Sequence, residues 1–344
     1  MNHDITFKKN NNKNDFQLLN NIKIECFLDF YSDNTFCVFK SINDILYLIY
    51  SYKFKTLILY NLIKNQKINQ IKKAHKNNII NIRHYSDNIN KRDLILSISA
   101  NDHNIKIWNV YNLECLFNIK DIYIYGGFSL ASLLAENNKN YISVCNNNYP
   151  LKPEKIKIID LYGNIIKEIN DSDENAFFID NYYDKKLSIN YIITGNINYI
   201  ISYDYNNNLI YNKYCDIYND NKENYHYSFV INNKEEIIQL IESCSDGNIR
   251  IWDFHSAKLL NKIKTSDYCL FGICLWNNEY LYVGCEDSLI KIVDINKGEI
   301  INYLIGHNNS VICIKKIIHP NYGEYLISQG YLNDGIKFWK KKFN

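Results

Sequence analysis

The stretch that decides the fold reads SCSDGNIRIWDF and runs from Ser243 to Phe254. Small residues lead into Asp246-Gly247, a pair typical of a tight turn between two antiparallel strands. After the turn, polar and apolar side chains alternate up to Trp252, as expected of a strand with one buried face. The stretch therefore predicts the end of one strand, a turn, and a second strand that finishes on a tryptophan.

The same pattern recurs along the chain. An aspartate precedes a tryptophan or valine by five or six residues in four places: Asp102–Trp108, Asp246–Trp252, Asp287–Val293 and Asp334–Trp339. Three further copies lack the tryptophan and end at Tyr60, Ile159 and Tyr203. The seven positions are 48, 51, 44, 49, 41 and 46 residues apart. A repeat of about 40 to 50 residues made of strands is typical of the blades of a β-propeller.

Each copy is expected to form four antiparallel strands. Around Trp252 they are YSFVI (227–231), EIIQLIESC (236–244), NIRIWDF (248–254) and KLLNKIK (258–264). Short runs rich in β-branched and aromatic residues, separated by Asn, Asp, Gly and Lys, favour strands. The last copy has residues for only three strands, so we expect Asn21–Phe30 to complete the last blade and close the ring. The predicted fold class is all-β, a seven-bladed β-propeller of four-stranded blades.

Three stretches carry a resemblance to a known family: ANDHNIKIWNV (100–110), CSDGNIRIWDF (244–254) and CEDSLIKIVDI (285–295). Together with Gly306-His307 they resemble WD40-repeat proteins, and the resemblance extends from about residue 21 to the end of the sequence. We therefore expect residues 1–20 to form a polar, low-complexity tail and residues 21–344 to form a single WD40 propeller domain.

The resemblance implies a polar network in some blades. A histidine before the first strand pairs with the aspartate of the turn, which gives His75–Asp102, His226–Asp246 and His307–Asp334. A Ser or Thr two residues before the aspartate is expected to link this pair to the tryptophan. That position holds Ala100, Cys244 and Cys285. Because Ala offers no hydrogen bond and Cys a weak one, the sequence predicts His–Asp pairs with a broken link to Trp.

Composition excludes several function classes. The formal net charge is +2 and the only arginines are Arg83, Arg92 and Arg250, so no specific nucleic-acid binding is expected. The ten cysteines form no CxxC pair and match no zinc spacing, so we expect reduced core thiols and no metal or cofactor. The longest apolar run is interrupted by Lys53 and Lys55, and the N-terminus lacks a signal peptide. The sequence therefore predicts no membrane insertion and a cytoplasmic or nuclear, not secreted, location.

The predicted function is a non-enzymatic scaffold that binds peptides or domains of other proteins. Catalysis by the His–Asp pairs, or turnover of a small-molecule substrate, is disfavoured because the pair recurs from blade to blade. The resemblance implies binding on the top face, where the residues before the turns are Asn101, Ser245, Glu286 and Asn333. The alternative function is an adaptor or substrate-receptor subunit of a larger complex: a ubiquitin ligase, an RNA-processing particle or a ribosome-assembly particle.

Overall fold

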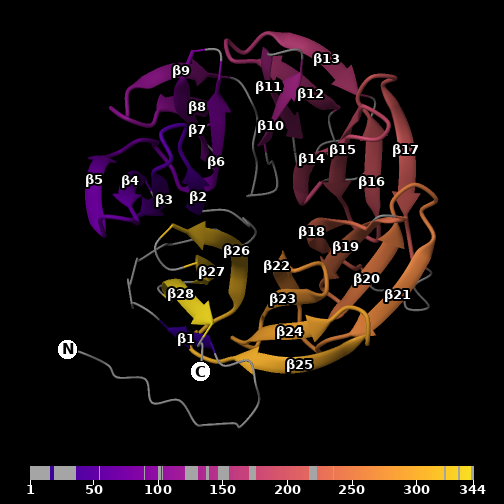
Figure 1. Ribbon diagram of the computed structural model, residues 1–344. Coiled ribbons are helices and arrows are strands. Elements are labelled where there is room, and N and C mark those ends of the chain that lie inside the picture. The colour runs from indigo at the N-terminus through magenta and orange to yellow at the C-terminus, as the bar shows by residue number, and fades with distance from the viewer. Residues whose placement is uncertain are drawn as a thin grey trace.

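The chain forms seven four-stranded antiparallel sheets arranged as a ring around a central channel (Figure 1). The computed structural model describes residues 16–18, 36–53, 55–88, 90–99, 102, 104–120, 131–136, 139–145, 155–169, 176–216, 223–234, 236–320, 323–331 and 334–341. The seven-bladed all-β fold predicted from the repeats is confirmed. Within the described residues, no helix is long and apolar enough to cross a membrane.

In each blade the strands run from the channel outward. Blades 1 to 3 consist of β2 (Phe36–Lys40), β3 (Leu46–Tyr52), β4 (Thr56–Asn61), β5 (Gln66–Ile71); β6 (Ile79–Asp87), β7 (Arg92–Ser99), β8 (Ile105–Asn109), β9 (Cys115–Ile119); β10 (Ala131–Glu136), β11 (Lys139–Cys145), β12 (Ile156–Asp160) and β13 (Ile165–Ile169).

Blades 4 to 7 follow the same order. Their strands are β14 (Phe178–Asp184), β15 (Ile189–Gly195), β16 (Ile200–Asp204), β17 (Leu209–Tyr214); β18 (His226–Asn233), β19 (Ile238–Cys244), β20 (Asn248–Asp253), β21 (Leu259–Lys264); β22 (Leu270–Trp276), β23 (Tyr280–Cys285), β24 (Ile290–Asp294), β25 (Glu299–Leu304); β26 (Val311–His319), β27 (Gly323–Gly330), β28 (Gly335–Lys341) and β1 (Phe16–Leu18).

The N-terminal part of the chain closes the ring, as predicted, but with a different segment. Strand β1 pairs antiparallel with β28, and Leu18 lies opposite Trp339. The closing strand therefore lies upstream of Asn21–Phe30, within the stretch expected to be a tail. Asn21–Phe30 lies outside the described residues, and the division at residue 20 stays a prediction.

The repeat positions read from the sequence all lie near the end of a third strand, in β4, β8, β12, β16, β20, β24 and β28. The aspartate that follows such a position holds the turn into the fourth strand. Asp253 Oδ1 accepts hydrogen bonds from the backbone amides of His255 (2.9 Å) and Ser256 (3.2 Å). Asp204 and Asp294 bond their turns in the same way. The Trp-Asp pair therefore ends one strand and starts the turn that leads to the next.

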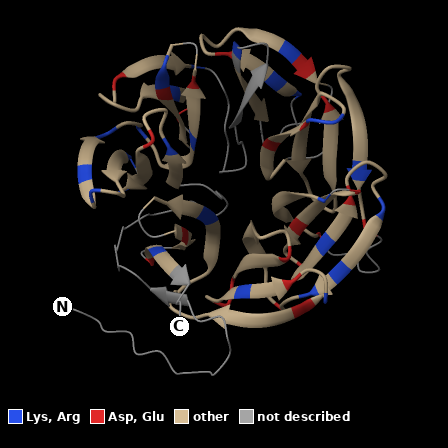
Figure 2. Ribbon diagram, in the orientation of Figure 1, with Lys and Arg blue, Asp and Glu red and all other residues tan. Residues whose placement is uncertain are grey.

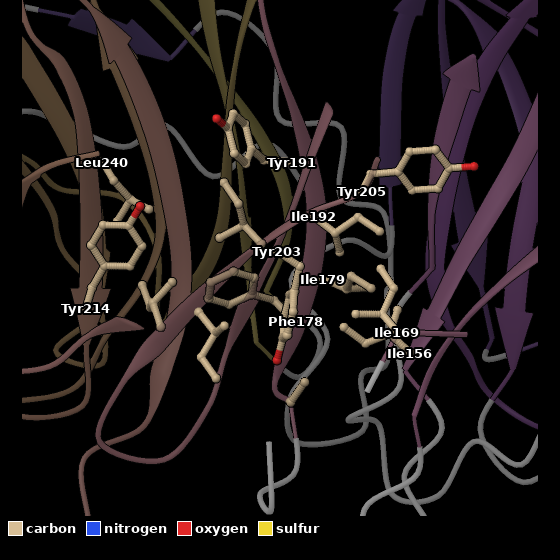
Figure 3. Packing of buried hydrophobic residues seen from close by; sticks show 14 of the residues in the cluster. Ile156, Ile169, Phe178, Ile179, Tyr191, Ile192, Tyr203, Tyr205, Tyr214 and Leu240 are labelled. Carbon is tan, nitrogen blue, oxygen red and sulfur yellow. The ribbon is translucent and has the colours of Figure 1, made fainter. Parts of the chain in front are cut away.

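Apolar side chains fill the space between neighbouring blades all round the ring. Separate clusters join blades 1 and 2, 2 and 3, 5 and 6, 6 and 7, and 7 and 1, while the largest joins blades 3, 4 and 5. In Figure 3, Ile156 of blade 3, Tyr191 of blade 4 and Leu240 of blade 5 belong to that largest cluster. Trp252 lies in it too, with its ring centroid 6.0 Å from that of Tyr214 in blade 4.

The fourth strands of blades 1 to 6 share a bulge opposite the repeat position. In blade 5, Ile251 pairs with Asn261 and Trp252 with Leu259, so Leu260 is left over. A bulge of this kind increases the local twist and interrupts the free edge of the strand. The bulges therefore make the outer strands poorer templates for pairing with another chain.

Removal of the closing strand tests its contribution to stability. Deletion of residues 1–18 removes the β1–β28 pairing, and backbone hydrogen bonds contribute about 1 kcal/mol each. We expect the free energy of unfolding, measured by urea titration, to fall by about 2 kcal/mol. Deletion of residues 1–12, which keeps β1, is the matched control. Equal stability of the two truncated proteins would show that β1 does not hold the ring closed.

Candidate interaction face

The top face of the ring carries the loops that enter each first strand and the turns between second and third strands. His75 and His307 lie in such entry loops, and His226 is the first residue of β18. Asp102, Asp246, Asp287 and Asp334 lie in the turns. The fold therefore brings the predicted histidines and aspartates together on one side of the molecule.

Blade 7 contains a complete network from the turn to the tryptophan. His307 Nδ1 lies 2.6 Å from Asp334 Oδ2, and His307 Nε2 lies 2.6 Å from Ser328 Oγ. Trp339 Nε1 donates to the same Ser328 hydroxyl at 2.7 Å. All four residues are buried. Each buried polar group of the network therefore has a partner, which is what keeps such a cluster stable inside a fold.

Blade 2 repeats the arrangement. His75 Nε2 lies 2.7 Å from Ser97 Oγ, which also accepts a hydrogen bond from Trp108 Nε1 at 2.8 Å. His75 Nδ1 lies 3.3 Å from Asp102 Oδ2. His307 and Asp334 therefore form the predicted pair through a hydrogen bond, whereas His75 Nδ1 and Asp102 Oδ2 lie next to each other without one.

The predicted break between the histidine and the tryptophan, inferred from Ala100, is wrong for blade 2, and blade 7 contains the same link. The linking hydroxyl, that of Ser97, lies near the end of the second strand, five residues before Asp102, rather than at position 100, which lies outside the described residues. Strand register explains the location. Trp108 pairs with Ile95, so Ser97, two residues further along β7, lies diagonally beside it on the same face of the sheet. In blade 7 Trp339 pairs with Leu326, two residues before Ser328.

Blade 5 has the same register but different chemistry. Trp252 pairs with Leu240, so Glu242 takes the linking position. Trp252 Nε1 donates to Glu242 Oε1 at 3.0 Å, and the other carboxylate oxygen contacts His226 Nδ1. The predicted His226–Asp246 pair does not form: the histidine pairs with Glu242, while Asp246 pairs with Arg250. A longer acidic side chain has replaced both the hydroxyl and the turn aspartate as partner of the histidine.

A cation two residues before the repeat position supports the turn in four blades: Lys106, Arg250, Lys291 and Lys337. Lys291 Nζ lies 2.8 Å from Asp287 and 3.2 Å from the carbonyl oxygen of Thr265 in the entry loop. Lys106 Nζ donates to the Ala74 carbonyl at 2.6 Å. Each cation therefore ties the entry loop or the turn aspartate to the third strand. Sequence reasoning missed this role, although the basic residue recurs at a fixed place in the repeat.

Burial and hydrogen bonds together set the pKa values in these networks. It lowers the pKa of His75 to about 4, with the Lys106 ammonium adding to the shift, and it also lowers the pKa of His307. Burial acts to raise the pKa of Asp334, but hydrogen bonds from His307 and Lys337 outweigh it and bring that pKa to about 2. At neutral pH, both networks therefore contain a neutral histidine, and in blade 7 it lies beside an ionised Asp334.

The residues predicted to face a partner have roles within the blades. Ser245 Oγ accepts a hydrogen bond from the backbone amide of Tyr225 at 2.9 Å, and Glu286 Oε2 accepts one from Cys269 at 3.1 Å. Both side chains fasten the turn to the entry loop of their own blade. Glu286 is exposed and Ser245 half-buried. Asn101 and Asn333 lie outside the described residues, and a partner-binding role for all four positions stays a prediction.

Two exposed apolar side chains on the top face were not predicted from the sequence. Tyr268 in the entry loop of blade 6 is 55% exposed, and Ile305 in the entry loop of blade 7 is 64% exposed. The carboxylate of Asp267, beside Tyr268, is 93% exposed. Exposure of single loop residues leaves no periodic pattern in the sequence, so only the fold could find them.

The other candidate sites show few features of metal binding or catalysis. No group of three His, Cys, Asp or Glu side chains among the described residues could hold a metal ion. Of the nine described cysteines, five are buried, while Cys115 and Cys215 are exposed. Burial raises the pKa of the Cys274 thiol to about 11, which disfavours the thiolate. Arg83 and Asp180 face each other in the channel, with Arg83 Nη2 3.4 Å from Asp180 Oδ2.

Replacement of the linking hydroxyls tests the networks. Ser97→Ala or Ser328→Ala leaves a buried histidine and a buried indole without a shared partner, which costs about 1–3 kcal/mol. We expect urea unfolding to show a loss of about 2 kcal/mol for each variant. The control is Ser256→Ala in an exposed turn, for which no loss beyond about 0.5 kcal/mol is expected. Losses of that small size at Ser97 and Ser328 would contradict the role given to the networks.

The lowered histidine pKa values predict an acid-sensitive fold. The unfolded chain binds protons on histidine below about pH 6.5, whereas His75 in the folded chain does so only near pH 4. Stability is therefore complete above about pH 6.5 and is lost as the pH falls from there. We expect a lower urea midpoint at about pH 5 than at about pH 7.5, and a smaller difference in His75→Gln. A pH dependence unchanged by that substitution would rule out His75 as the source.

Comparison with known proteins adds one partial similarity. No family model matches the sequence. A stretch of 100 residues is 29% identical to the U3 small nucleolar RNA-associated protein 21 homolog of Schizosaccharomyces pombe. The match covers 29% of this chain and 11% of that protein, so the chain spans only a small part of the relative it matches. With seven closed four-stranded blades, recurring Trp-Asp positions and His–Ser–Trp networks, the chain is a seven-bladed β-propeller whose repeats resemble those of WD40-repeat proteins.

Proposed function

We propose that the chain is a non-enzymatic scaffold that binds partner proteins on its top face. The proposal rests on how the polar side chains are placed: those suited to catalysis are bonded inside the blades, and others are exposed. His75 and His307, the groups best suited to acid–base chemistry, are buried and bonded within their own blades. Tyr268, Ile305 and Glu286, in the top-face loops of blades 6 and 7, are exposed. Exposed side chains on a rigid ring favour recognition of a partner over turnover of a substrate.

The chemistry of this surface suggests the kind of segment it binds. Tyr268 and Ile305 supply apolar contact area, and Glu286 supplies negative charge, while Asp267 forms an exposed ion pair with Lys264. Aromatic and aliphatic anchors contribute most of the energy at interfaces, while charges at the rim select the partner. A partner segment with apolar side chains and flanking lysines or arginines matches both features.

A second, more specific function is favoured by the partial similarity to a protein associated with U3 small nucleolar RNA. We propose that the chain acts as an adaptor in an RNA-processing or ribosome-assembly particle inside the cell. Direct binding of RNA is not part of this proposal. Basic and acidic side chains alternate around the ring rather than forming a basic stripe (Figure 2), and an RNA-binding surface needs such a stripe.

The top-face proposal is tested with the double variant Tyr268→Ala/Ile305→Ser. Tagged wild-type and variant chains are purified from cells, and the proteins that accompany each are quantified by mass spectrometry. We expect the variant to lose its main partners by about tenfold, because truncation of central anchors costs at least about 1.4 kcal/mol. Ile318→Ser, on the opposite face of blade 7, is the matched control, since Ile318 is 69% exposed. Full retention of partners by the double variant would exclude this face.

The same purifications test the adaptor role. Quantitative PCR compares U3 RNA with an unrelated small nucleolar RNA in each sample. Selective enrichment of U3 RNA that is lost in the top-face variant is the expected result. If proteins co-purify but U3 RNA is not enriched, the scaffold function stands and the adaptor proposal fails.

A further inference from the structure

The first strands of the blades surround the central channel, and one register position recurs on each of them (Figure 1). In blade 2, Leu96 follows the partner of Trp108 on β7 and pairs with Arg83 on β6. The same two pairing steps lead to Asp180 in blade 4 and to Lys315 in blade 7. In blades 1, 3, 5 and 6 they lead to Cys37, Ser132, Val230 and Cys274. We name these seven residues the channel ring.

The channel ring contains two cations and one carboxylate. Arg83 Nη2 lies 3.4 Å from Asp180 Oδ2, so this pair joins two blades that are not neighbours. Arg83, Asp180 and Lys315 all line one cavity in the channel. Because one carboxylate offsets only one of the two cations, the channel ring keeps an excess of positive charge.

Lys315 carries the excess charge. The residue is exposed, and it forms no hydrogen bond or ion pair with the part of the chain that the structure describes. The next residue, Lys316, pairs instead with Glu324 at 2.5 Å and lies 4.5 Å from the centre of the Trp276 ring. Lys315 therefore differs from its neighbour in the strand, since it presents an unpaired ammonium group to the cavity.

Two thiols report which side of the channel is positive. Cys37 in blade 1 lies between the ring positions of blades 7 and 2. Burial raises the pKa of Cys37 to about 11, while the charges of Arg83 and Lys315 act to lower it. Burial also raises the pKa of Cys274 in blade 6 to about 11, with the Lys315 charge opposing the shift. The positive side is therefore formed by blades 6, 7, 1 and 2, and Asp180 lies opposite them in blade 4.

Small residues leave the cavity next to Lys315 open. Two residues before the ring position, and so nearer to the top face, the first strands of blades 5, 6 and 7 carry Ser228, Gly272 and Cys313. All three line the same cavity. A Cβ atom at Gly272 would lie 2.8 Å from the Ile312 carbonyl oxygen, so only glycine lets β22 approach β26 this closely. Large side chains therefore do not fill this part of the channel.

The chemistry of the cavity favours a phosphate group. Phe178 and Phe229 form part of its wall, with ring centroids 5.1 Å apart. Apolar walls strengthen the field of nearby charges and concentrate ions of the opposite sign. A guanidinium group binds phosphate through parallel N–H donors, and an ammonium group adds a compact charge. A phosphate has enough oxygen atoms to contact Arg83, Lys315 and the Ser228 hydroxyl together, whereas a carboxylate has only two.

We propose that the central channel binds the phosphate group of a small molecule or ion between Lys315 and Arg83, with the Ser228 hydroxyl as a further donor. Asp180 competes with the phosphate for Arg83 and so limits the affinity. The site is separate from the exposed side chains of the top face. Binding there involves no turnover, and it is independent of the scaffold function.

The test is isothermal titration calorimetry at low salt with two probes, inorganic phosphate and phenyl phosphate. The wild-type chain is compared with Lys315→Met, with Lys315→Arg, which keeps the charge, and with Asp180→Asn. The matched control is Lys185→Met, which removes an exposed lysine from the turn between β14 and β15. Lys315 and Lys185 are both exposed, so thermal unfolding of their variants is expected to match the wild type.

We expect the wild type to bind phosphate at a single site. Affinity falls about tenfold or more in Lys315→Met, because a charge-assisted hydrogen bond is lost. It rises about threefold in Asp180→Asn, because a repelling carboxylate is removed. Lys315→Arg and Lys185→Met bind as the wild type does. Tighter binding of phenyl phosphate than of inorganic phosphate assigns the site to a phosphate ester, and the reverse order assigns it to the free ion.

Three results overturn the proposal. The first is that neither probe binds the wild type. The second is an equal loss of affinity in Lys185→Met and Lys315→Met, since the phosphate then binds to surface lysines in general. The third is weaker binding by Asp180→Asn than by the wild type, because Asp180 then does not compete with the phosphate.

Discussion

Apolar packing between neighbouring blades is the constraint on which the rest of the structure depends. A single four-stranded sheet with two apolar faces is not stable in water, so each blade needs a neighbour on both sides. Clusters such as the one that joins Tyr191 to Trp252 meet this need all round the ring. The ring has to close for the first and last blades to be covered, and β1 beside β28 provides that closure. The surfaces that face the channel and the top of the ring result from this closed packing of blades. They do not themselves hold the ring together.

The polar networks show how one register position is filled in different ways. In blades 2 and 7 a serine hydroxyl stands between the histidine and the indole, and in blade 5 Glu242 does so. A carboxylate reaches further than a hydroxyl and accepts from both groups, so the histidine no longer needs the turn aspartate. Asp246 is then free to pair with Arg250. The substitution of one residue is thus accompanied by a rearrangement of the whole cluster, because a buried polar group left without a partner is costly.

Much of the fold could be predicted from the sequence because the spacing of the repeats relates positions that lie far apart in the chain. The positions of Tyr60, Ile159 and Tyr203, which lack tryptophan, are located correctly from the repeat spacing together with the Asp or Asn that follows each. The closing strand was misplaced because a strand of three residues, Phe16–Leu18, has too few positions to show alternation. The linking serines were misplaced for another reason. They are set by the pairing of β7 with β8, and a diagonal contact across a register cannot be read by counting back from one aspartate.

The candidate surfaces were less predictable, since exposure depends on what a neighbouring blade covers. Tyr211 and Ile210 are adjacent in β17, yet the tyrosine packs against Tyr191 and Phe254 while the isoleucine is 53% exposed. An apolar residue in a strand is normally assigned to the core, so the sequence alone hides Ile210 among core residues. The bulges add to this effect, because a residue such as Ile166 is displaced from the pairing pattern of its strand. Only the assembled ring separates apolar residues that hold blades together from those that face outward.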